Sequence, residues 1–572
     1  MKKQFPILFL IFILFISLLI GCKNSIENNS RPFEYFFDFK TEIERLTKEN
    51  PIILKTVARN NISQTILDTI DWENEFSFFL KSDINHPRFK DGYEISMEEN
   101  GDKKKVTYSA KESQFSVRLM EFSYQKNDLK EIHILYEENN FITKSKYELR
   151  YNPSDFYTIS GYQSVPFLYE ENFKVNGNFH FPKEGKWRTV LQIKNETLNE
   201  EIPFIQLLKF ENGKWYAEIE NAEEKIKCSE VSLLGDSFFI KLPVFDSELK
   251  GKIIADTLIK GAWFNYSKGI DYVIPFYSEY NKTFRFASQG NEQALSPKSI
   301  SGKWEAEFSK GTKDYYKAIG IFNQEGTKVS GTVLTETGDY RFLDGNYIND
   351  SLMLSCFDGS HAFLFMASVK NKNQMEGKFW SGIHWNEPWT AKRNENGQLS
   401  NPDSLTFLKE GYSNINFSFP NLDSQMVSAS DNKYKNKVLV VQILGSWCPN
   451  CLDETTFFTE IYKSKHEKGL EIIGLAFERS ADFNKARSSV KRFKEQLNAP
   501  FDFLIAGTAS TANANKALPM LNHIMSFPTA IYIDRSGKVR KIHTGFYGPG
   551  TGDYYQKFRE ETNAFLDRLL LE

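Results

Sequence analysis

The chain has 572 residues, and its 71 Lys and Arg against 74 Asp and Glu leave a formal net charge of −3. This balance excludes a dedicated nucleic-acid binder, which would show a basic stripe. The 41% of hydrophobic residues exclude a disordered chain, and the length favours about three or four domains that fold without disulfides. The 15% of aromatic residues favour β-rich structure. The five cysteines, too few for a disulfide-dense scaffold, are Cys22, Cys228, Cys356, Cys448 and Cys451.

The first residues predict an export signal with a lipid attachment site. A basic start precedes an almost wholly apolar run at 5–20, whose charged flank and early end disfavour a permanent membrane span. The run ends in LIGC at 19–22, which resembles a bacterial lipobox, where the cysteine becomes the lipidated first residue. We expect residues 1–21 to be a lipoprotein signal peptide, Cys22 to carry the lipid and residues 22–31 to form a polar tether. The alternative is a membrane anchor with an incidental cysteine.

Beyond this leader, no apolar run in the sequence is long enough to cross a bilayer. The rest of the chain is therefore predicted to be lipid-anchored in the bacterial cell envelope, facing the periplasm. Disulfides persist in such a compartment, so a redox-active cysteine pair has a chemical role there.

The chain is predicted to be multidomain, and its first unit, residues 32–165, is expected to be α+β. The apolar residues at 33–49 have helical spacing, and residues 68–80 predict a second helix. Short alternating runs separated by turn residues follow, which is typical of a β-meander. No constellation of chemically active residues is evident in this unit.

Residues 170–394 contain an internal duplication. Three landmarks recur at separations of 117, 112 and 116 residues, and this agreement is unlike chance. The recurring landmarks are Trp187 and Trp304, Phe245 and Phe357, and Gly261 and Gly377. Both halves consist of short predicted strands with Gly and Asn turns. We therefore expect a duplicated all-β unit that resembles a barrel or a sandwich, since closure protects strand edges.

This β unit also holds a group of residues that could line a ligand mouth. They are Asp358, His361, Trp380, His384, Trp385 and Trp389. The other interpretation, which we favour, is the core and rim of a β-domain. Cys228 and Cys356 are isolated in sequence and are expected to be buried apolar residues, with a bridge between the two repeats as the alternative.

The last unit carries the clearest chemistry. A polar linker at 395–411 leads into residues 412–572, where a buried strand at 438–445 is followed at once by WCPNC at 447–451. Strands then alternate with helices, which predicts an α/β sheet. Such sheets place ligands beyond the carboxyl ends of their strands, and the cysteine pair lies at that end.

The two cysteines of this motif have different predicted roles. Cys448 would stand at a helix N-terminus, where unpaired N–H groups and the helix dipole stabilise a thiolate. Cys451 would lie one turn deeper on the same face and be shielded. We expect Cys448 to attack a substrate disulfide and Cys451 to resolve the mixed disulfide. The Cys448–Cys451 disulfide is then the redox centre, and no cofactor is expected.

The motif after a buried strand resembles the thioredoxin fold, and specifically the TlpA/ResA-like family of envelope thiol–disulfide oxidoreductases. The resemblance covers residues 414–572; FSFPNL at 417–422 matches the family's first strand, and SFPT at 526–529 matches its cis-proline segment. It implies that Pro528 is cis and faces the cysteines, and that the backbone of Phe527 pairs with the substrate. The other expected substrate contacts are Trp447, Pro449 and Asn450.

The resemblance also implies a role for Glu454, at a position where the ResA-like group carries a buried acid that moves protons. An i, i+3 offset places Glu454 next to Cys451, and burial would raise the pKa of such a carboxyl into the range suited to acid/base work. A solvated first-turn glutamate is the alternative. Glu478, which ends the neighbouring strand, is a weaker candidate.

Three alternative functions are open. A zinc half-site would need a second ligand pair, which the chain lacks, so no metal is expected. A peroxiredoxin-like peroxide reductase usually has Thr or Ser three residues before its cysteine, where this chain has Gly445. The β units could instead carry the main function, as a ligand-binding surface lipoprotein.

The predicted function is an envelope-anchored reductase of protein disulfides. Its expected partners are protein thiols and disulfides, a membrane electron donor and the lipid bilayer, and no nucleic acid.

Overall fold

The computed structural model describes most of the chain after its first residues. The described ranges are 37–60, 62–89, 91–140, 143–165, 168–194, 199–234, 236–286 and 299–572. The predicted signal peptide, the tether and Cys22 lie outside them. The chain divides into two compact units, the second of which includes residues 177–572. Within the described ranges, no helix is long and apolar enough to cross a membrane.

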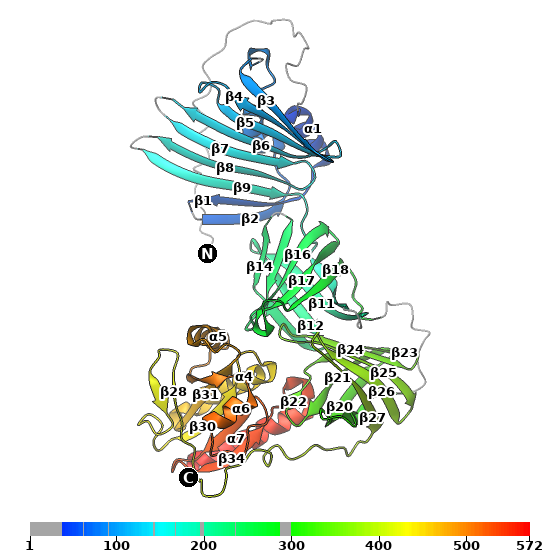
Figure 1. The fold of residues 1–572 in the computed structure, drawn as a ribbon, viewed down its shortest axis with the longest axis vertical. Coiled ribbons are helices and arrows are strands. Elements are labelled where there is room, and N and C mark those ends of the chain that lie inside the picture. The colour runs from blue at the N-terminus through cyan, green and yellow to red at the C-terminus, as the bar shows by residue number, and fades with distance from the viewer. Residues whose placement is uncertain are drawn as a thin grey trace, which may run out of the picture. The chain divides into compact units, whose positions relative to one another are not determined.

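The first unit is built on a nine-stranded sheet with the order β2-β1-β9-β8-β7-β6-β5-β4-β3 (Figure 1). Its strands are β1 (Ile53–Arg59), β2 (Ile62–Asp68), β3 (Tyr93–Asn100), β4 (Lys103–Ala110), β5 (Val117–Gln125), β6 (Asp128–Asn139), β7 (Lys144–Asn152), β8 (Phe156–Val165) and β9 (Tyr169–Asn178). Its helices are α1 (Phe39–Glu49), α2 (Trp72–Glu75), α3 (Ser77–Lys81) and the 3₁₀ turn η1 (Pro87–Phe89). The rings of Phe39 and Phe76 contact Tyr151 of β7, so the helices pack on one face of the sheet.

The first unit differs from the sequence prediction in three places. The helix expected at 68–80 is two short helices, α2 and α3, with the N-cap of α2 at Asp71. Residues 53–59 and 62–68, for which no strand was predicted, form the neighbouring strands β1 and β2. The sheet also continues to the end of β9 at Asn178, beyond the predicted end of this unit at 165.

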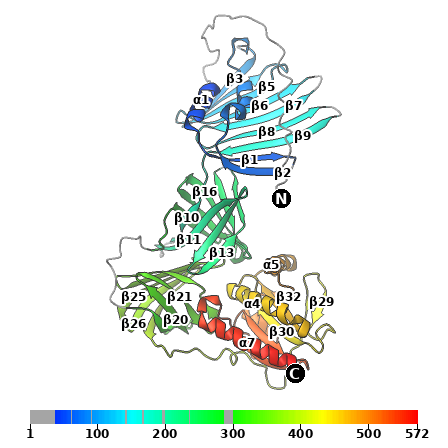
Figure 2. The ribbon, with the colours of Figure 1, turned by 180° about the vertical axis from the view of Figure 1, so that it is seen from behind.

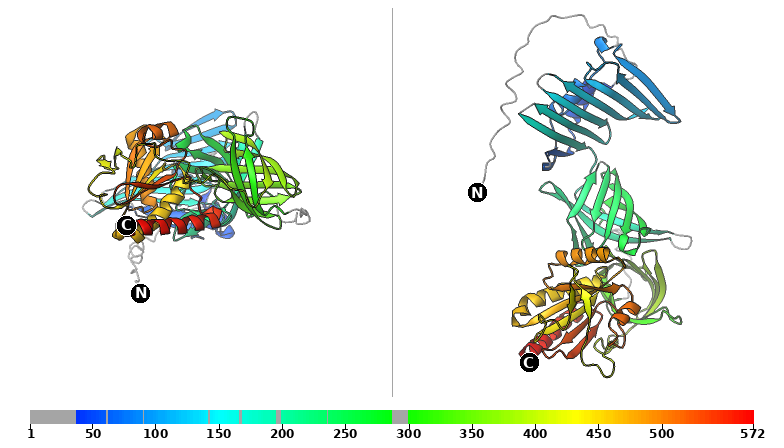
Figure 3. Two further views of the ribbon diagram at one scale, coloured as in Figure 1. Left: turned by 90° about the horizontal axis from the view of Figure 1, so that it is seen from below. Right: turned by 60° about the vertical axis from the view of Figure 1, so that its left-hand side comes forward.

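The second sheet has nine strands in the order β13-β12-β11-β10-β18-β17-β16-β15-β14. They are β10 (Gly185–Lys194), β11 (Asn199–Glu211), β12 (Lys214–Asn221), β13 (Glu224–Cys228), β14 (Glu230–Leu234), β15 (Ser237–Lys241), β16 (Ser247–Ala255), β17 (Leu258–Asn265) and β18 (Val273–Tyr280), with η2 (Tyr266–Lys268) before β18. The strands, green in Figure 3, curve around a core that contains Trp187 and Trp263. The sheet is therefore barrel-like.

The third sheet also has nine strands, in the order β20-β19-β27-β26-β25-β24-β23-β21-β22. They are β19 (Gly302–Phe308), β20 (Tyr316–Glu325), β21 (Lys328–Thr335), β22 (Gly338–Asp339), β23 (Leu343–Ile348), β24 (Ser351–Phe357), β25 (Ala362–Asn371), β26 (Gln374–Ser381) and β27 (Trp385–Arg393). An additional pairing of β20 with β21 closes the sheet into a barrel, which removes the free strand edges.

The two barrel-like sheets repeat the same plan. In each, the first strand pairs with the last, β10 with β18 and β19 with β27. The indole of Trp187 donates to the carbonyl of Lys183 at 2.9 Å, and that of Trp304 donates to the carbonyl of Ile300 at 2.8 Å. The same four-residue hydrogen bond at both tryptophans supports the duplication inferred from the sequence.

The cysteines of the two repeats are not joined. Cys228 and Cys356 are free and buried, and burial raises the pKa of both thiols. The alternative of a bridge between the repeats is therefore wrong.

The C-terminal domain is an α/β domain built on a five-stranded sheet with the order β32-β31-β30-β33-β34. Its strands are β30 (Val438–Leu444), β31 (Leu470–Glu478), β32 (Asp502–Thr508), β33 (Thr529–Ile533) and β34 (Val539–Thr544), preceded by the hairpin β28 (Ser418–Pro420) and β29 (Met426–Ser428). Its helices are α4 (Pro449–Lys465), α5 (Phe483–Gln496), α6 (Thr511–Ala517) and α7 (Asp553–Leu571), with the 3₁₀ turns η3 (His466–Lys468) and η4 (Pro549–Thr551). Figure 2 shows α4 and α7 over one face of the sheet. β30 runs parallel to β31 and antiparallel to β33.

Candidate active site

A buried strand and a helix N-terminus position the cysteine pair. Every residue of β30 is buried, and the chain turns directly from this strand into α4. Cys448 is the N-cap of α4 with an extended backbone, and its Sγ accepts a hydrogen bond from the backbone N–H of Cys451 at 3.3 Å. Pro449 follows at the first helical position, where a missing N–H costs nothing. Both cysteines are free thiols; Cys448 is 6% exposed and Cys451 is fully buried.

The loop before β33 lies against Cys448. The Phe527–Pro528 peptide bond is cis, as the resemblance implied. The thiol of Cys448 donates to the carbonyl of Phe527 at 3.5 Å. Trp447 holds the other side of this loop, because its ring meets that of Phe527 edge to face and its indole donates to the carbonyl of Phe477. The sulfur that would attack and the backbone carbonyl of Phe527 therefore lie side by side.

Glu454 is buried behind the pair, which rules out the solvated glutamate considered above. Its Oε2 accepts from the side chain of Gln442 at 2.8 Å, and among the described residues its Oε1 has no hydrogen-bond partner. Burial raises the pKa of Glu454 to about 8, against the effect of Gln442. Burial and Cys448 raise the pKa of Cys451, and Glu454 adds to this rise. A carboxyl of this kind can hold or release a proton near neutral pH.

Glu478 has a structural place in the site. Its two carboxylate oxygens accept from the backbone N–H and the hydroxyl of Ser446, at 2.8 and 2.7 Å. Burial raises the pKa of Glu478, and the two hydrogen bonds oppose that rise. These hydrogen bonds from Ser446 to Glu478 hold the turn between β30 and Cys448 in place.

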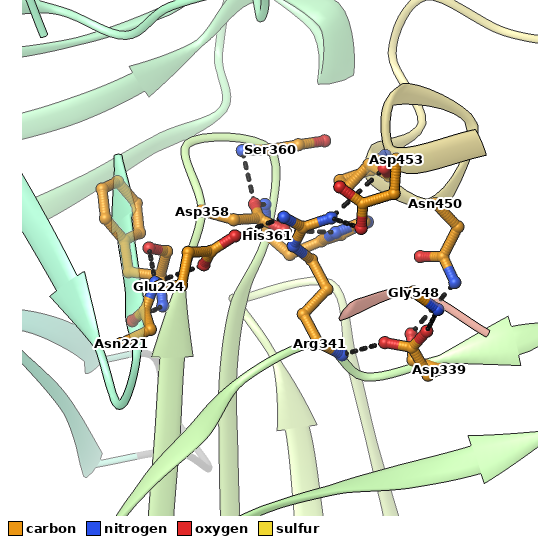
Figure 4. Close-up of polar contacts among 12 residues, drawn as sticks. Asn221, Glu224, Asp339, Arg341, Asp358, Ser360, His361, Asn450, Asp453 and Gly548 are labelled. Carbon is orange, nitrogen blue, oxygen red and sulfur yellow. Dashed lines mark hydrogen bonds and ion pairs between the residues drawn. The ribbon is translucent and has the colours of Figure 1, made fainter. Parts of the chain in front are cut away.

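Loops of the third sheet cover the redox motif through Arg341 (Figure 4). The guanidinium donates to Asp453 of α4 at 2.6 Å and to the carbonyl of Pro449 at 3.2 Å. It also pairs with Glu224 of the second sheet, and its Nε lies 3.7 Å from Asp358. One buried arginine therefore joins both barrel-like sheets to the first turn of the redox helix.

Three further hydrogen bonds hold loops of the third sheet against the C-terminal domain. The side chain of Asn450 donates to the carbonyl of Asp339 at 3.3 Å, and the Asp339 carboxylate accepts from the N–H of Gly548 at 2.6 Å. Ser360 donates to the carbonyl of Trp447 at 2.9 Å. At Gly338 (φ 145°) a Cβ would lie 2.3 Å from the Asn450 amide, so the close approach requires glycine there.

The carboxylates around Arg341 are crowded. Burial raises the pKa of Asp453 to about 7; Glu224 and Asp339 add to the rise, and Arg341 opposes it. Burial also raises the pKa of Asp339. A single arginine thus stabilises several carboxylates that have little access to water.

Sequence reasoning did not single out Arg341, Asp339, Ser360 or Asp453. Their partners come from a different domain, and no motif marks them.

The structure does not bring together the residues of the predicted ligand mouth. Trp380 and Trp389, on neighbouring strands of the third sheet, belong to different hydrophobic clusters, and Trp385 is 41% exposed. His384 contacts Tyr272, while Asp358 and His361 lie beside Arg341. Within the described part of the chain, no cluster of three or more potential metal ligands occurs.

Replacing Arg341 tests this interdomain network. Arg341→Met leaves the carboxylates of Glu224, Asp358 and Asp453 together without a cation, so we expect a loss of about 3 kcal/mol in the free energy of unfolding. Cys448 should also react faster with iodoacetamide, because the loop that covers it is released. Denaturant unfolding and alkylation rates measure the two effects. Lys317→Met, at an exposed position of β20, should match the wild type; equal behaviour of both variants would contradict the role of Arg341.

The five-stranded sheet, the cysteine at the helix N-cap and the cis-proline loop define the C-terminal domain as a thioredoxin-fold thiol–disulfide oxidoreductase domain. Residues 409–556 match the Redoxin family model. The thiol-disulfide oxidoreductase ResA of Bacillus cereus (strain ATCC 10987 / NRS 248) is 28% identical over 143 residues, which cover 25% of this chain and 72% of that protein. ResA of Geobacillus thermodenitrificans (strain NG80-2) is 28% identical over 112 residues, 20% of this chain and 57% of that protein.

The chain thus spans less than two thirds of the length of the second of these relatives. Among solved structures, a putative thiol:disulfide interchange protein DsbE from Chlorobium tepidum is 21% identical, with a TM-score of 0.21, over 27% of this chain and 96% of that chain. The match to the family model lies within the C-terminal domain.

Proposed function

We propose that the chain is a reductase of protein disulfides in the bacterial cell envelope, with Cys448 as the attacking thiolate and Cys451 as the resolving thiol. The observation that carries this proposal is the position of Cys448, whose sulfur receives a helix N–H and touches the carbonyl of Phe527. Helix N–H groups stabilise a thiolate. Once the Cys448 thiol has reacted, this carbonyl can instead accept a hydrogen bond from the backbone of an extended substrate. The relatives named thiol-disulfide oxidoreductase support the same chemistry.

The reaction has two exchange steps. The Cys448 thiolate attacks one sulfur of the substrate disulfide, a mixed disulfide forms, and the other substrate sulfur leaves as a thiolate that takes up a proton. Cys451 then loses its proton to Glu454 and attacks Cys448, which releases the second substrate thiol. Two electrons pass from the cysteine pair to the substrate, and the Cys448–Cys451 disulfide remains. Oxidation of the pair is reversed by a membrane electron donor.

Burial supports this division of labour. Cys451 is fully buried and its pKa is raised, so it stays protonated until the mixed disulfide has formed. Glu454, with a pKa of about 8, is mostly protonated at neutral pH, so its ionised fraction, which interacts electrostatically with Cys451, accepts that proton. The lipid anchor at Cys22 and the periplasmic location belong to the same proposal and rest on the LIGC sequence at 19–22.

Trapping tests the attacking and resolving roles. In the full chain, Cys451→Ala removes the thiol that completes the exchange, so we expect Cys448 to retain substrates as mixed disulfides that dithiothreitol releases. Affinity purification from cells followed by non-reducing electrophoresis measures this. The matched control is the Cys448→Ala, Cys451→Ala double variant, which should retain nothing. If the single variant retains no more than the double one, protein disulfides are not the substrates.

The reduction potential of the pair tests the direction of electron flow. We expect a value near the thioredoxin value of about −270 mV, and a value near the DsbA value of about −120 mV would make the protein an oxidant instead. Equilibration with glutathione or dithiothreitol buffers, followed by alkylation and mass spectrometry, gives this potential.

A further inference from the structure

A cleft of about 830 Å³ lies beside the redox motif, between the second sheet and the C-terminal domain. One wall is the turn η2 after β17, and the other is the start of α5 with the end of β31. Ser446 and Trp447, the two residues before Cys448, also line it. The cleft therefore reaches the backbone that precedes the attacking cysteine.

Two cations from opposite walls face this cleft. Lys268 of η2 lies over the ring of Tyr272 at 5.0 Å, and Arg479, the residue after β31, lies over the ring of Trp447 at 4.6 Å. Among the described residues, neither cation forms an ion pair with a carboxylate. Burial lowers the pKa of Lys268 to about 8 and lowers that of Arg479 as well. Lys268 is half-buried and Arg479 is exposed at the edge of the cleft. Asp358 and Glu478 act on these two cations only electrostatically, so both cations can still form an ion pair with a bound anion.

The acidic groups of the cleft are already engaged. Asp246 pairs with Arg492 at 3.4 Å, and the carboxylate of Glu478 is held by Ser446. Lys485 of α5 adds a third cation to the lining. The surface offered to a ligand is therefore positive and rich in hydroxyl groups.

The position of the cleft links it to the reacting sulfur. On the other side of the motif, Arg341 and Ser360 donate hydrogen bonds to the backbone carbonyls of Pro449 and Trp447, respectively. Arg479 interacts electrostatically with Cys448, so its charge lies close to the site of attack. A substrate that reaches Cys448 past Trp447 would place the residues beside its disulfide between the two cations.

We propose that this cleft binds acidic side chains that flank the reacting disulfide of a polypeptide substrate, with Lys268 and Arg479 as the specificity-determining residues. The proposal rests on the proposed function, because the polypeptide is the disulfide substrate of Cys448. Carboxylates fit the site since they can pair with both cations and accept hydrogen bonds from the serine hydroxyls of the lining.

The test compares two disulfide-linked peptide dimers of one length, whose cysteine is flanked by Glu in one and by Lys in the other. The reduced full chain is mixed with each dimer at low salt, and the oxidation rate is followed by stopped-flow tryptophan fluorescence. Each rate is divided by that of dithiothreitol with the same peptide, which removes the intrinsic effect of charge on thiol exchange. We expect the Glu peptide to react about tenfold faster than the Lys peptide, since each partly exposed ion pair contributes a few-fold.

Substitution of the two cations tests whether this preference arises in the cleft. Lys268→Met with Arg479→Gln should bring the ratio of the two rates close to one, and each single substitution should give an intermediate ratio. Lys491→Met, on α5 outside the cleft lining, should keep the wild-type ratio. A wild-type ratio of one, or an unchanged ratio in the double variant, would overturn the inference. Uncharged bis(2-hydroxyethyl) disulfide separates the two proposals. If this compound is reduced but the two peptides react at equal relative rates, only the cleft inference fails. If no disulfide is reduced, the proposed function fails as well.

Discussion

Cys448→Ser is expected to lower the rate of disulfide reduction by at least about 10³-fold, because a hydroxyl does not ionise near neutral pH and cannot form the mixed disulfide. The fold should survive this change. Serine is a favourable N-cap, and its Oγ can accept the same N–H of Cys451 that the sulfur accepts. The variant should therefore unfold within about 1 kcal/mol of the wild type. Insulin reduction with dithiothreitol and a thermal melt measure the two quantities.

A control separates the redox pair from the other cysteines. Cys228→Ala removes a free, buried thiol of the second sheet and should leave the rate of insulin reduction unchanged. If Cys448→Ser kept a substantial share of the wild-type rate, another nucleophile would carry the reaction, and the roles proposed for the pair would be wrong.

Glu454→Gln is expected to remove a pH dependence of stability. Burial raises the pKa of this carboxyl from its ordinary value of 4.5 to about 8. Between these values the folded state holds a proton that the unfolded state releases, so the free energy of unfolding falls as pH rises from about 4.5 to 8. The full loss is about 5 kcal/mol, at 1.36 kcal/mol for each unit of pKa. Glutamine carries no such proton, so the variant should be more stable than the wild type above pH 8.

Denaturant unfolding at several pH values between 5 and 9 measures this difference. Glu460→Gln, at an exposed position of the same helix, is the matched control and should keep the slope of the wild type. If Glu454→Gln and the wild type lose stability in parallel across this range, Glu454 is not the buried acid described above. Under the proposed function, Glu454→Gln should also slow the second exchange step, in which Cys451 gives up its proton.

The redox motif could be predicted because its determinants are local. An apolar run makes β30, Pro449 starts α4, and the three-residue step from Cys451 to Glu454 brings the acid beside the thiol. The barrel-like sheets were partly predictable, because a duplicated pattern of tryptophan and glycine survives in the sequence. The same reasoning could not reveal β1 and β2, whose side chains are mostly part-exposed and whose pairing partner β9 lies far along the chain.

The cover over the motif was beyond sequence reasoning for a similar reason. Arg341 pairs with Asp453 and Glu224, which lie 112 and 117 residues away in the sequence. Nothing in the residues around Arg341 marks it as part of a redox site. Its role follows only from the docking of one domain on another, which local patterns do not encode.

The ion pair between Glu224 and Arg341 has a consequence for the two repeats. Glu224 begins β13, and Arg341 follows β22, which holds the corresponding place in the other repeat. The duplicated halves thus meet through matching positions that carry opposite charges. Two copies of the first half would set carboxylate against carboxylate, and two copies of the second would set guanidinium against guanidinium. The halves are therefore not interchangeable, because only the second half carries the arginine that pairs with Asp453 of the redox helix.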